Sequence, residues 1–272
     1  YFIIIILVHI LLLDIIKRFR YEIENLYKEL ILSIVNLQEL VDAGFHFGHR
    51  TSRWNPKMKP FIFGKRNLIH IINLRETVRG LITAYKFLTK VSSGRKEILF
   101  VGTKWQAKDA IVAEAKRSNM HYVCERWLGG TLTNFETIRK RLKRLEELEE
   151  LEENGSIHNY SKKIISSLTR ERKKIAKNLE GIKNMNKLPS VLVIVDPKKE
   201  HIAMKEAIKM GIPTICLTDT DCDPDLVDVC VPGNDDAIRA IRLFLNKTAD
   251  AILEGQPSAK IEEDSKALQE TT

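Results

Sequence analysis

Cysteine is scarce in this sequence and forms no recognisable pattern. The 272 residues contain four cysteines, with no CxxC pair and no close group of cysteine and histidine. A structural zinc site or a disulfide framework needs such spacing. Three of the four lie on or beside expected buried strands, where a free thiol behaves as a small apolar side chain. We therefore expect Cys124, Cys216, Cys222 and Cys230 to be reduced thiols.

No apolar run reaches the length of about 20 residues that a bilayer-spanning helix requires. The apolar run Tyr1–Leu13 is interrupted by His9 and ends at Asp14. No small-residue cleavage site follows it, so it makes a poor secretory signal. We expect residues 1–35 to be an N-terminal apolar extension that packs on the domain as an accessory element. Membrane contact by this extension is not expected; a partner-binding or membrane-surface helix is the alternative.

The motifs that bind nucleotides and calcium are missing as well. Neither G-x-x-x-x-G-K-[ST] nor G-x-G-x-x-G occurs, although Gly102-Thr103-Lys104 follows an expected strand. The acidic loop from Asp219 carries proline and cysteine where a calcium loop needs its turn glycine and its bidentate glutamate. His46 and His49 have the spacing of metal ligands but lack a third ligand nearby. We predict no cofactor and no dedicated metal site, with scattered Mg²⁺ contacts at the acidic loop as the alternative.

Charge of the two signs is distributed unevenly along the chain. The formal net charge is +8, from 44 basic and 36 acidic residues. Basic residues dominate between Asp42 and Lys96, and acidic residues dominate between Leu188 and Glu254. Such segregation suggests a protein with one face on a polyanion and another turned away from it. A generally alkaline protein is the alternative.

The fold is clearest in the last third of the chain. Val191–Val195 is a run of five apolar, mostly β-branched residues, typical of a strand covered on both faces of a parallel sheet. A helical pattern follows and ends at Gly211-Ile212-Pro213, and Thr214–Leu217 repeats the pattern of a buried strand. A short strand over Val227–Val231 and a helix from about Asp235 to Leu253 complete a doubly wound α/β pattern.

Aspartates follow the strands of this pattern. Asp196 comes directly after Val195, and four more aspartates lie between residues 219 and 225. Ligands of doubly wound sheets bind at the carboxyl ends of the strands. An enzyme that acts on a nucleotide or sugar phosphate is therefore our second hypothesis. It lacks an evident nucleophile–base pair and a catalytic histidine at that edge of the sheet.

The segment Gly44–Arg66 mixes turn formers, cations and aromatic rings. It holds three glycines, two prolines, six lysines or arginines and five aromatic residues. Glycine and proline predict a loop here. Cations interleaved with planar rings suit a nucleic acid, because phosphates need the charge and exposed bases stack. Leu68–Ile72 is predicted as the first strand of the sheet, and Leu74–Lys90 as a helix with a basic outer face.

The elements that follow continue the α/β pattern. We predict a strand over Glu97–Val101, a helix over Ala107–Ser118, a strand over His121–Cys124 and a tight loop over Trp127–Asn134.

Residues 137–187 have a different pattern. Two apolar stripes at helical spacing flank the polar turn Asn154-Gly155-Ser156, which is typical of an antiparallel helical hairpin with a coiled-coil seam. Such charged runs are usually solvated faces, but basic clusters that meet at the root of a hairpin favour contact with RNA or protein. The hairpin residues expected to make this contact are Arg139, Lys140, Arg141, Arg144, Arg172, Lys173 and Lys174.

Several motifs resemble those of a known family. GFHFGHRTSRWNPKMKPFIF, YVCERWLGGTLTNF, GIKNM, VIVDPKKEHIAMKEA, GIPTICLTDTDCDPDLVD and VPGNDDAIRAIRLFLNK resemble, in this order, the bacterial-type ribosomal small-subunit protein two (S-two) family. The resemblance covers roughly residues 36–255, and GIPTICLTDTDCDPDLVD looks most like plastid members. The domain boundaries expected from it are 1–35 for the extension, 36–136 and 188–255 for the two parts of the α/β domain, 137–187 for the hairpin and 256–272 for a polar tail without regular structure.

The resemblance implies an α/β fold: a three-layer flavodoxin-like parallel sheet with an inserted antiparallel coiled-coil helical hairpin. It implies a structural constituent of the small ribosomal subunit that binds small-subunit rRNA, helps to dock the mRNA-binding protein one, is not an enzyme and has no small-molecule substrate. A plastid ribosome is the expected location, with the bacterial cytoplasm or the mitochondrion as alternatives. Carried onto this sequence, the RNA-facing candidates are Arg50, Arg53, Trp54, Asn55, Lys57, Lys59, Lys65, Arg66, Lys104, Trp127 and Asn134.

Overall fold

A parallel sheet of five strands forms the centre of the molecule. The computed structural model describes residues 36–270, apart from the side chains of residues 158–159 and 257–270. The strands are β4 (Ile98–Val101), β5 (His121–Val123), β6 (Val191–Val195), β7 (Thr214–Thr218) and β8 (Val229–Pro232), and their order is β5-β4-β6-β7-β8. In chain order this is 2-1-3-4-5, the flavodoxin-like arrangement. The predicted fold class is therefore confirmed at the level of the sheet, whereas the N-terminal extension lies outside the described residues.

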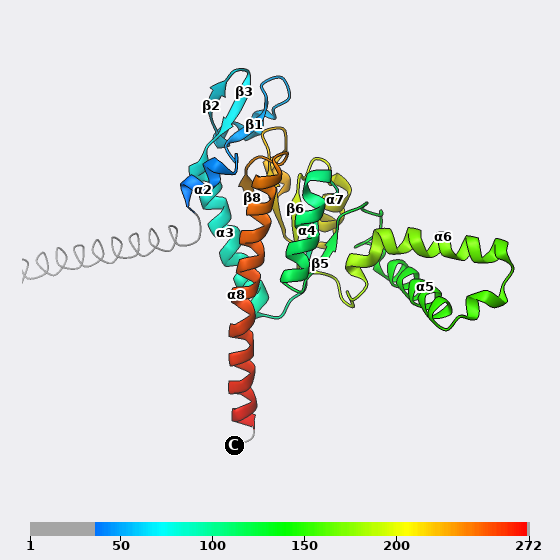
Figure 1. Cartoon of the computed structure of the whole chain (residues 1–272). Helices are drawn as coiled ribbons and strands as arrows, with labels where there is room; N and C mark the ends of the chain where they lie inside the picture. The colour runs from blue at the N-terminus through cyan, green and yellow to red at the C-terminus, as the bar shows by residue number, and fades with distance from the viewer. Residues whose placement is uncertain (1–35, 271–272) are drawn as a thin grey trace, which may run out of the picture.

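Helices cover both faces of this sheet (Figure 1). The helices are α2 (Leu37–Asp42), α3 (Leu74–Ser93), α4 (Trp105–Arg117), α5 (Phe135–Glu153), α6 (Lys162–Leu179), α7 (His201–Met210) and α8 (Ile238–Glu270). Alternate strand residues separate two cores: Val193 packs with α3, α4 and α8, whereas Leu192 and Ile194 pack with α7 and the root of α5. Because both faces are buried, the strands need apolar residues at every position.

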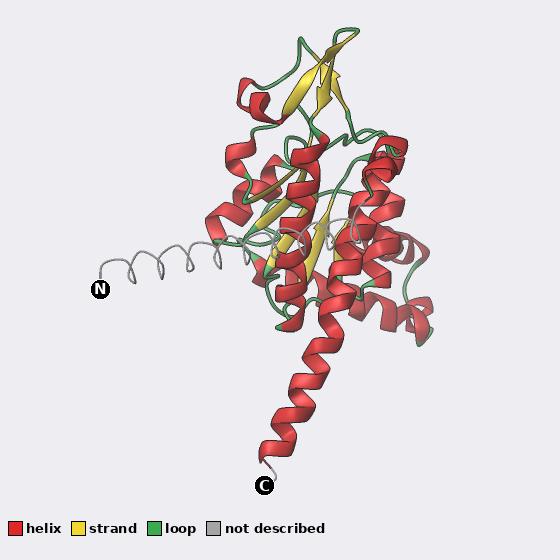
Figure 2. Cartoon of the chain, turned by 90° about the vertical axis from the view of Figure 1, so that its left-hand side faces the viewer, coloured by secondary structure: helices red, strands yellow, loops and turns green. Residues whose placement is uncertain are grey.

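A second, antiparallel sheet stands apart from the first (Figure 2). Its strands are β1 (Phe47–Arg50), β2 (Ile62–Arg66) and β3 (Ile69–Ile72), in the order β1-β3-β2, and the 3-10 helix η1 (Pro56–Phe61) precedes β2. Two sequence predictions are therefore wrong. Segment 44–66 is not one loop, and the strand near Leu68–Ile72 does not join the parallel sheet. Pro56 begins η1, where a missing N–H costs nothing. We call this element the small sheet.

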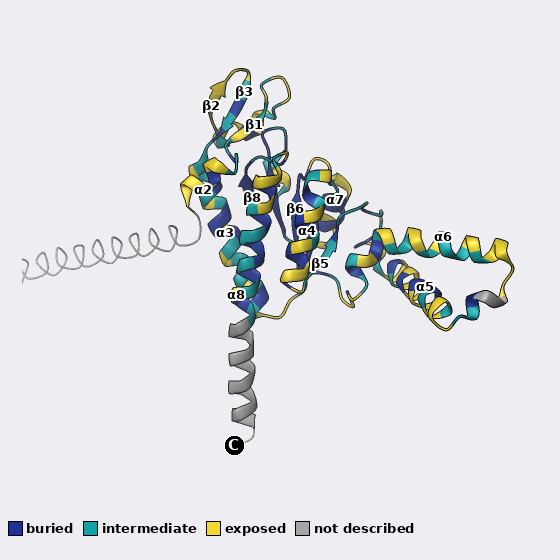
Figure 3. Cartoon of the chain, in the orientation of Figure 1, coloured by how far each residue is buried: buried dark blue, intermediate teal, exposed yellow. Residues whose placement is uncertain are grey.

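Two long helices, α5 and α6, project from the domain side by side (Figure 1), joined through the 3-10 helix η2 (Ser156–Asn159). They occupy most of residues 137–187, and the boundaries expected for a hairpin insertion stay a prediction. The two helices do not form a regular coiled-coil seam: α5 buries Ile138, Leu142, Leu145 and Leu148, whereas α6 buries only Leu179 of its residues Lys162–Leu179. Much of α6 is exposed along its length (Figure 3).

The closing helix is longer than its sequence pattern indicated. We predicted an end near Leu253 and a tail without regular structure, but α8 continues to Glu270. It begins at Ile238, later than the predicted start near Asp235, and in the turn before it Asn234 Oδ1 accepts hydrogen bonds from the backbone N–H groups of Asp236 and Ala237. Within residues 36–270 no helix is long and apolar enough to cross a membrane. All four cysteines are free thiols, and Cys216 and Cys222 are buried.

Candidate nucleic-acid interface

The small sheet presents a group of unpaired cations. Five basic residues on it or beside it are exposed and form no ion pair with a described residue: Arg50, Arg53, Lys59, Lys65 and Arg66. Phe63, on β2, exposes 79% of its surface beside them in the sequence. Exposed cations around an exposed ring offer a polyanion both charge and a stacking surface. This group, which we call the cationic sheet surface, holds five of the eleven RNA-facing candidates.

The other candidates from this segment are partly committed to holding the fold. Asn55 caps η1 by accepting from the Lys57 backbone N–H at 3.0 Å, and its own N–H donates to the Thr220 carbonyl at 2.8 Å. The Lys57 ammonium lies 2.9 Å from Asp223 and 2.7 Å from Asp225. Trp54 is half-buried, with its ring centroid 5.2 Å from that of His70. Asn55 and Lys57 therefore fasten the small sheet to the loop after β7.

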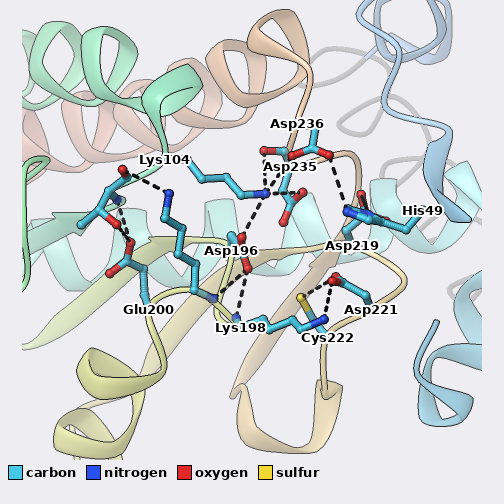
Figure 4. A network of polar contacts seen from close by, with 12 residues as sticks. His49, Lys104, Asp196, Lys198, Glu200, Asp219, Asp221, Cys222, Asp235 and Asp236 are labelled. Atoms are coloured by element: carbon cyan, nitrogen blue, oxygen red, sulfur yellow. Dashed lines mark hydrogen bonds and ion pairs between the residues drawn. The ribbon is translucent and has the colours of Figure 1, made fainter. Parts of the chain in front are cut away.

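Lys104 is buried among carboxylates at the carboxyl edge of the parallel sheet (Figure 4). Its ammonium lies 2.9 Å from Asp196, 2.8 Å from Asp235 and 3.0 Å from Asp236, and 12% of its side chain is exposed. Burial disfavours the charged form, but Asp235 and Asp196 outweigh it and hold the pKa of Lys104 above its usual value. Lys104 thus neutralises aspartates of its own chain, and its charge is not free for a phosphate.

His49 of β1 contacts the aspartates at the same edge of the sheet. Its Nδ1 lies 2.9 Å from Asp219 Oδ2 and its Nε2 lies 3.5 Å from Asp236 Oδ2. The hydrogen bond with Asp219, opposed by burial, raises the pKa of His49 to about 9. Burial, reinforced by the charges of Asp196 and Asp219, raises the pKa of Asp235 to about 8. The aspartates predicted at the strand ends do meet, and they gather two cationic side chains from distant segments.

Some of these side chains have the chemistry and spacing of metal ligands. His49, Asp219 and Asp235 form one such group and Asp196, Cys222 and Asp235 another, with ligand atoms within 4.8 Å of one another in each. Lys104 supplies a positive charge to the same carboxylates. The residue types in these two groups could hold a metal ion. The absence of a dedicated metal site therefore stays a prediction.

Raising the pH from 6.5 to about 9 should destabilise the fold. His49 and Asp235 both bind a proton more tightly in the fold than in the unfolded chain. Their contribution is full below the unfolded pKa and is lost as the pH rises through the folded pKa: from 6.5 to about 9 for His49, and from 3.8 to about 8 for Asp235. Thermal melts in EDTA should show the Tm falling by several degrees across this window. His49→Asn should flatten the decline above pH 8; an unchanged slope would contradict the assignment to His49.

Trp127 is part of the core and not of an RNA-facing surface. It is 6% exposed, and its Nε1–H donates to Glu206 at 3.1 Å. A buried ring offers no face to a base, so Trp127 is removed from the proposed interface. Asn134, at the end of the same loop, is exposed and accepts a hydrogen bond from the Thr137 hydroxyl at 2.8 Å. Asn134 therefore remains available.

The basic residues of the helical pair fall into two groups. Some are paired: Lys140 with Glu136 at 3.1 Å, Arg144 with Glu147 at 3.0 Å and Arg172 with Glu152 at 2.8 Å. Arg139 donates to the Met185 carbonyl at 3.2 Å. By contrast, Arg141, Lys173 and Lys174 are exposed and have no ion pair with a described residue. The unpaired group is the one able to contact a polyanion.

Sequence reasoning missed Glu206 and Phe63. Glu206 stood in a helical pattern without any sign that a loop 70 to 80 residues earlier would surround its carboxylate. Phe63 was counted among the aromatic residues of the segment but was not singled out. The available signal for Phe63 was an aromatic residue two and three positions before the cations Lys65 and Arg66.

The parallel sheet of flavodoxin-like order, with a cationic small sheet beside it, defines an α/β protein whose exposed chemistry suits RNA. The chain belongs to a ribosomal family: the family model described as Ribosomal protein S2 matches residues 40–255. A protein named small ribosomal subunit protein uS2 from Syntrophobacter fumaroxidans is 52% identical over 236 residues, which are 87% of this chain and 85% of the relative.

Two further relatives carry the same name. The protein from Geotalea uraniireducens is 51% identical over 85% of this chain and 90% of its own length. The protein from Rhodopirellula baltica is 54% identical over 83% of this chain and 87% of its own length. Membership of this family makes the chain a structural ribosomal protein and not an enzyme, as the sequence motifs predicted.

Proposed function

We propose that the chain is a structural constituent of the small ribosomal subunit that holds small-subunit rRNA with two surfaces. The first is the cationic sheet surface. The second is the root of the helical pair, with Asn134 and Arg141. The observation that carries the proposal is the group of five exposed cations, on the small sheet or beside it, that form no ion pair with a described residue. Neutralising phosphates with such cations releases counterions, which makes binding strongly dependent on salt.

The expected biological role is support of translation through assembly of the subunit. Docking of neighbouring ribosomal proteins, among them the mRNA-binding protein one, is part of this proposal. It rests on the family resemblance and on exposed side chains beyond the cationic sheet surface, such as Trp105 at 75% exposure. Exposed aromatic side chains are frequent anchors of protein interfaces.

A plastid ribosome is our proposed location, with the bacterial cytoplasm or a mitochondrion as alternatives. Two features of the sequence support it: the likeness of GIPTICLTDTDCDPDLVD to plastid members, and richness in isoleucine, lysine and asparagine, which is typical of an AT-rich organellar genome. Immunodetection in purified plastid and mitochondrial fractions would distinguish the three locations.

Sedimentation of a native lysate tests the ribosomal role and its electrostatic basis together. We expect the protein to migrate with the small subunit in a sucrose gradient at low salt and to be released as salt increases, because counterion release drives its binding. Immunodetection across the gradient gives the result. Migration as a free species that is indifferent to salt would contradict the proposal.

A further inference from the structure

Glu206 is a buried carboxylate that a single loop surrounds with hydrogen-bond donors. It lies on α7 and is 7% exposed. Its Oε1 accepts from Trp127 Nε1 at 3.1 Å and from the Gly130 N–H at 2.7 Å. Its Oε2 accepts from the Leu132 N–H at 3.0 Å and from the N–H and hydroxyl of Thr133 at 3.1 and 3.2 Å. The loop Trp127–Thr133 thus uses both oxygens of one side chain.

The charge on Glu206 strengthens this arrangement. Burial alone would raise the pKa of Glu206, but the donors from the loop outweigh burial and hold that pKa below its usual value. Hydrogen bonds to an ionised acceptor are roughly twice as strong as neutral ones. The loop itself is irregular, and Gly130 adopts a φ of +92° that side chains rarely tolerate. Within the loop, the Thr131 N–H and hydroxyl donate to the Leu128 carbonyl at 3.1 and 2.6 Å, whereas the N–H groups of Gly130, Leu132 and Thr133 find their acceptors on Glu206.

The hydrogen bonds to Glu206 also decide which groups of the loop are left for a ligand. The N–H groups of Gly130, Leu132 and Thr133 point inward to the carboxylate and cannot bind a phosphate. The outer side of the loop forms a pocket of about 230 Å³ with the first turns of α5. Asn134 and Arg141 both line this pocket.

We propose that Glu206 is a positioning residue for rRNA binding, because it fixes the loop that sets Asn134 and Arg141 around one pocket. The inference rests on the proposed function and adds to it a residue that does not touch the RNA. Asn134 follows the last donor of the loop directly and precedes Phe135, the first residue of α5. Loosening the loop therefore displaces the start of α5 and the pocket with it.

The test uses the full-length chain and a transcript of its own small-subunit rRNA. Glu206→Gln keeps the volume and removes the charge, and we expect it to lower the affinity about tenfold, the scale of one lost hydrogen bond to a charged group. The loss should shrink when Arg141→Ala is already present, because only Asn134 is then left to position, and it should persist in full with Arg66→Ala, because Arg66 lies on the small sheet. Glu114→Gln is the matched control: Glu114 is also buried on a helix but accepts from Arg117 alone among the hydrogen bonds found for its carboxylate.

Amide hydrogen exchange gives a readout that does not need RNA. Glu206→Gln should speed exchange at residues 130–133 and leave the strands of the parallel sheet unchanged. Trp127→Phe, which removes the indole N–H donor and leaves a smaller aromatic ring, should give a smaller change in the same direction if Glu206→Gln does not fold. Unchanged loop exchange, or equal losses of affinity in the Arg141→Ala and Arg66→Ala backgrounds, would overturn the inference. Failure of the unmodified chain to bind rRNA, with loop exchange altered as expected, would count against the proposed function. It would not count against the role of Glu206 in fixing the loop.

Discussion

Alanine at Arg53, Lys65 and Arg66 together should weaken binding to small-subunit rRNA by about 100-fold near 0.1 M salt. Each cation that neutralises a phosphate contributes a slope of roughly 0.7 to 0.9 in log affinity against log salt, so the triple variant should lose about 2.1 to 2.7 of that slope. All three side chains are exposed and belong to the cationic sheet surface. Filter binding over a salt series measures both the affinity and the slope.

A triple variant elsewhere separates local contact from overall charge. Lys116→Ala, Lys205→Ala and Lys209→Ala together remove the same charge from exposed positions on α4 and α7, outside the proposed interface. We expect a loss below about threefold for this control, since distant charges act only through screened long-range attraction. Equal losses in the two variants would mean that net charge and not the small sheet governs binding. Thermal stability of the first variant should be nearly unchanged.

Gly80→Ala should destabilise the protein by about 2 kcal/mol or more, although alanine is the better helix former by about 1 kcal/mol. Gly80 lies within α3 where that helix crosses β8. A Cβ atom there would stand 2.5 Å from the Cys230 carbonyl oxygen and 3.1 Å from the Val231 Cα. Both neighbours are backbone atoms of a strand, so they cannot move aside as a flexible side chain could. The midpoint of denaturant unfolding measures the effect.

Gly64→Ala is the control for that substitution. Gly64 lies on β2, and no atom would come within 4 Å of an added Cβ. We expect this variant to unfold within about 0.5 kcal/mol of the unmodified protein, as is usual for surface substitutions. If Gly80→Ala were neutral or stabilising, helix propensity would outweigh the close approach of α3 to β8, and the packing argument would be wrong.

The parallel sheet could be predicted from sequence because its strands are buried on both faces. Val191–Val195 and Thr214–Thr218 carry apolar or β-branched residues at nearly every position, a pattern that few other structures require. The helices around them follow from helical spacing and from caps such as Asn234. In these segments the local conformational preference agrees with the tertiary packing. The local sequence pattern is therefore sufficient to predict the strand or helix.

Two features could not be predicted in the same way. One is the small sheet, and the other is the burial of Lys104 among Asp196, Asp235 and Asp236. Strand β2 buries none of its five residues fully, and without alternation its glycine and basic residues look like a loop. The partners of Lys104 lie 92 to 132 residues further along the chain, so its sequence neighbours do not reveal that it is buried. Trp127 was misplaced for a related reason, because its hydrogen-bond acceptor is on a distant helix.

The attachment of the small sheet has a consequence for the order of biosynthesis. The small sheet lies near the start of the family domain. The hydrogen bonds and the ion pair that hold it, however, come from residues in the last quarter of the described chain. The His49 N–H donates to the Thr220 hydroxyl at 3.0 Å, Lys57 pairs with Asp223, and the Asn234 N–H donates to the Phe45 carbonyl at 3.2 Å. A nascent chain that has not yet emerged as far as Thr220 lacks all of these contacts. We therefore expect the surface proposed for rRNA to mature only after residues 220–234 have emerged, so a product interrupted before them should compete poorly with the longer chain for its place in the assembling subunit.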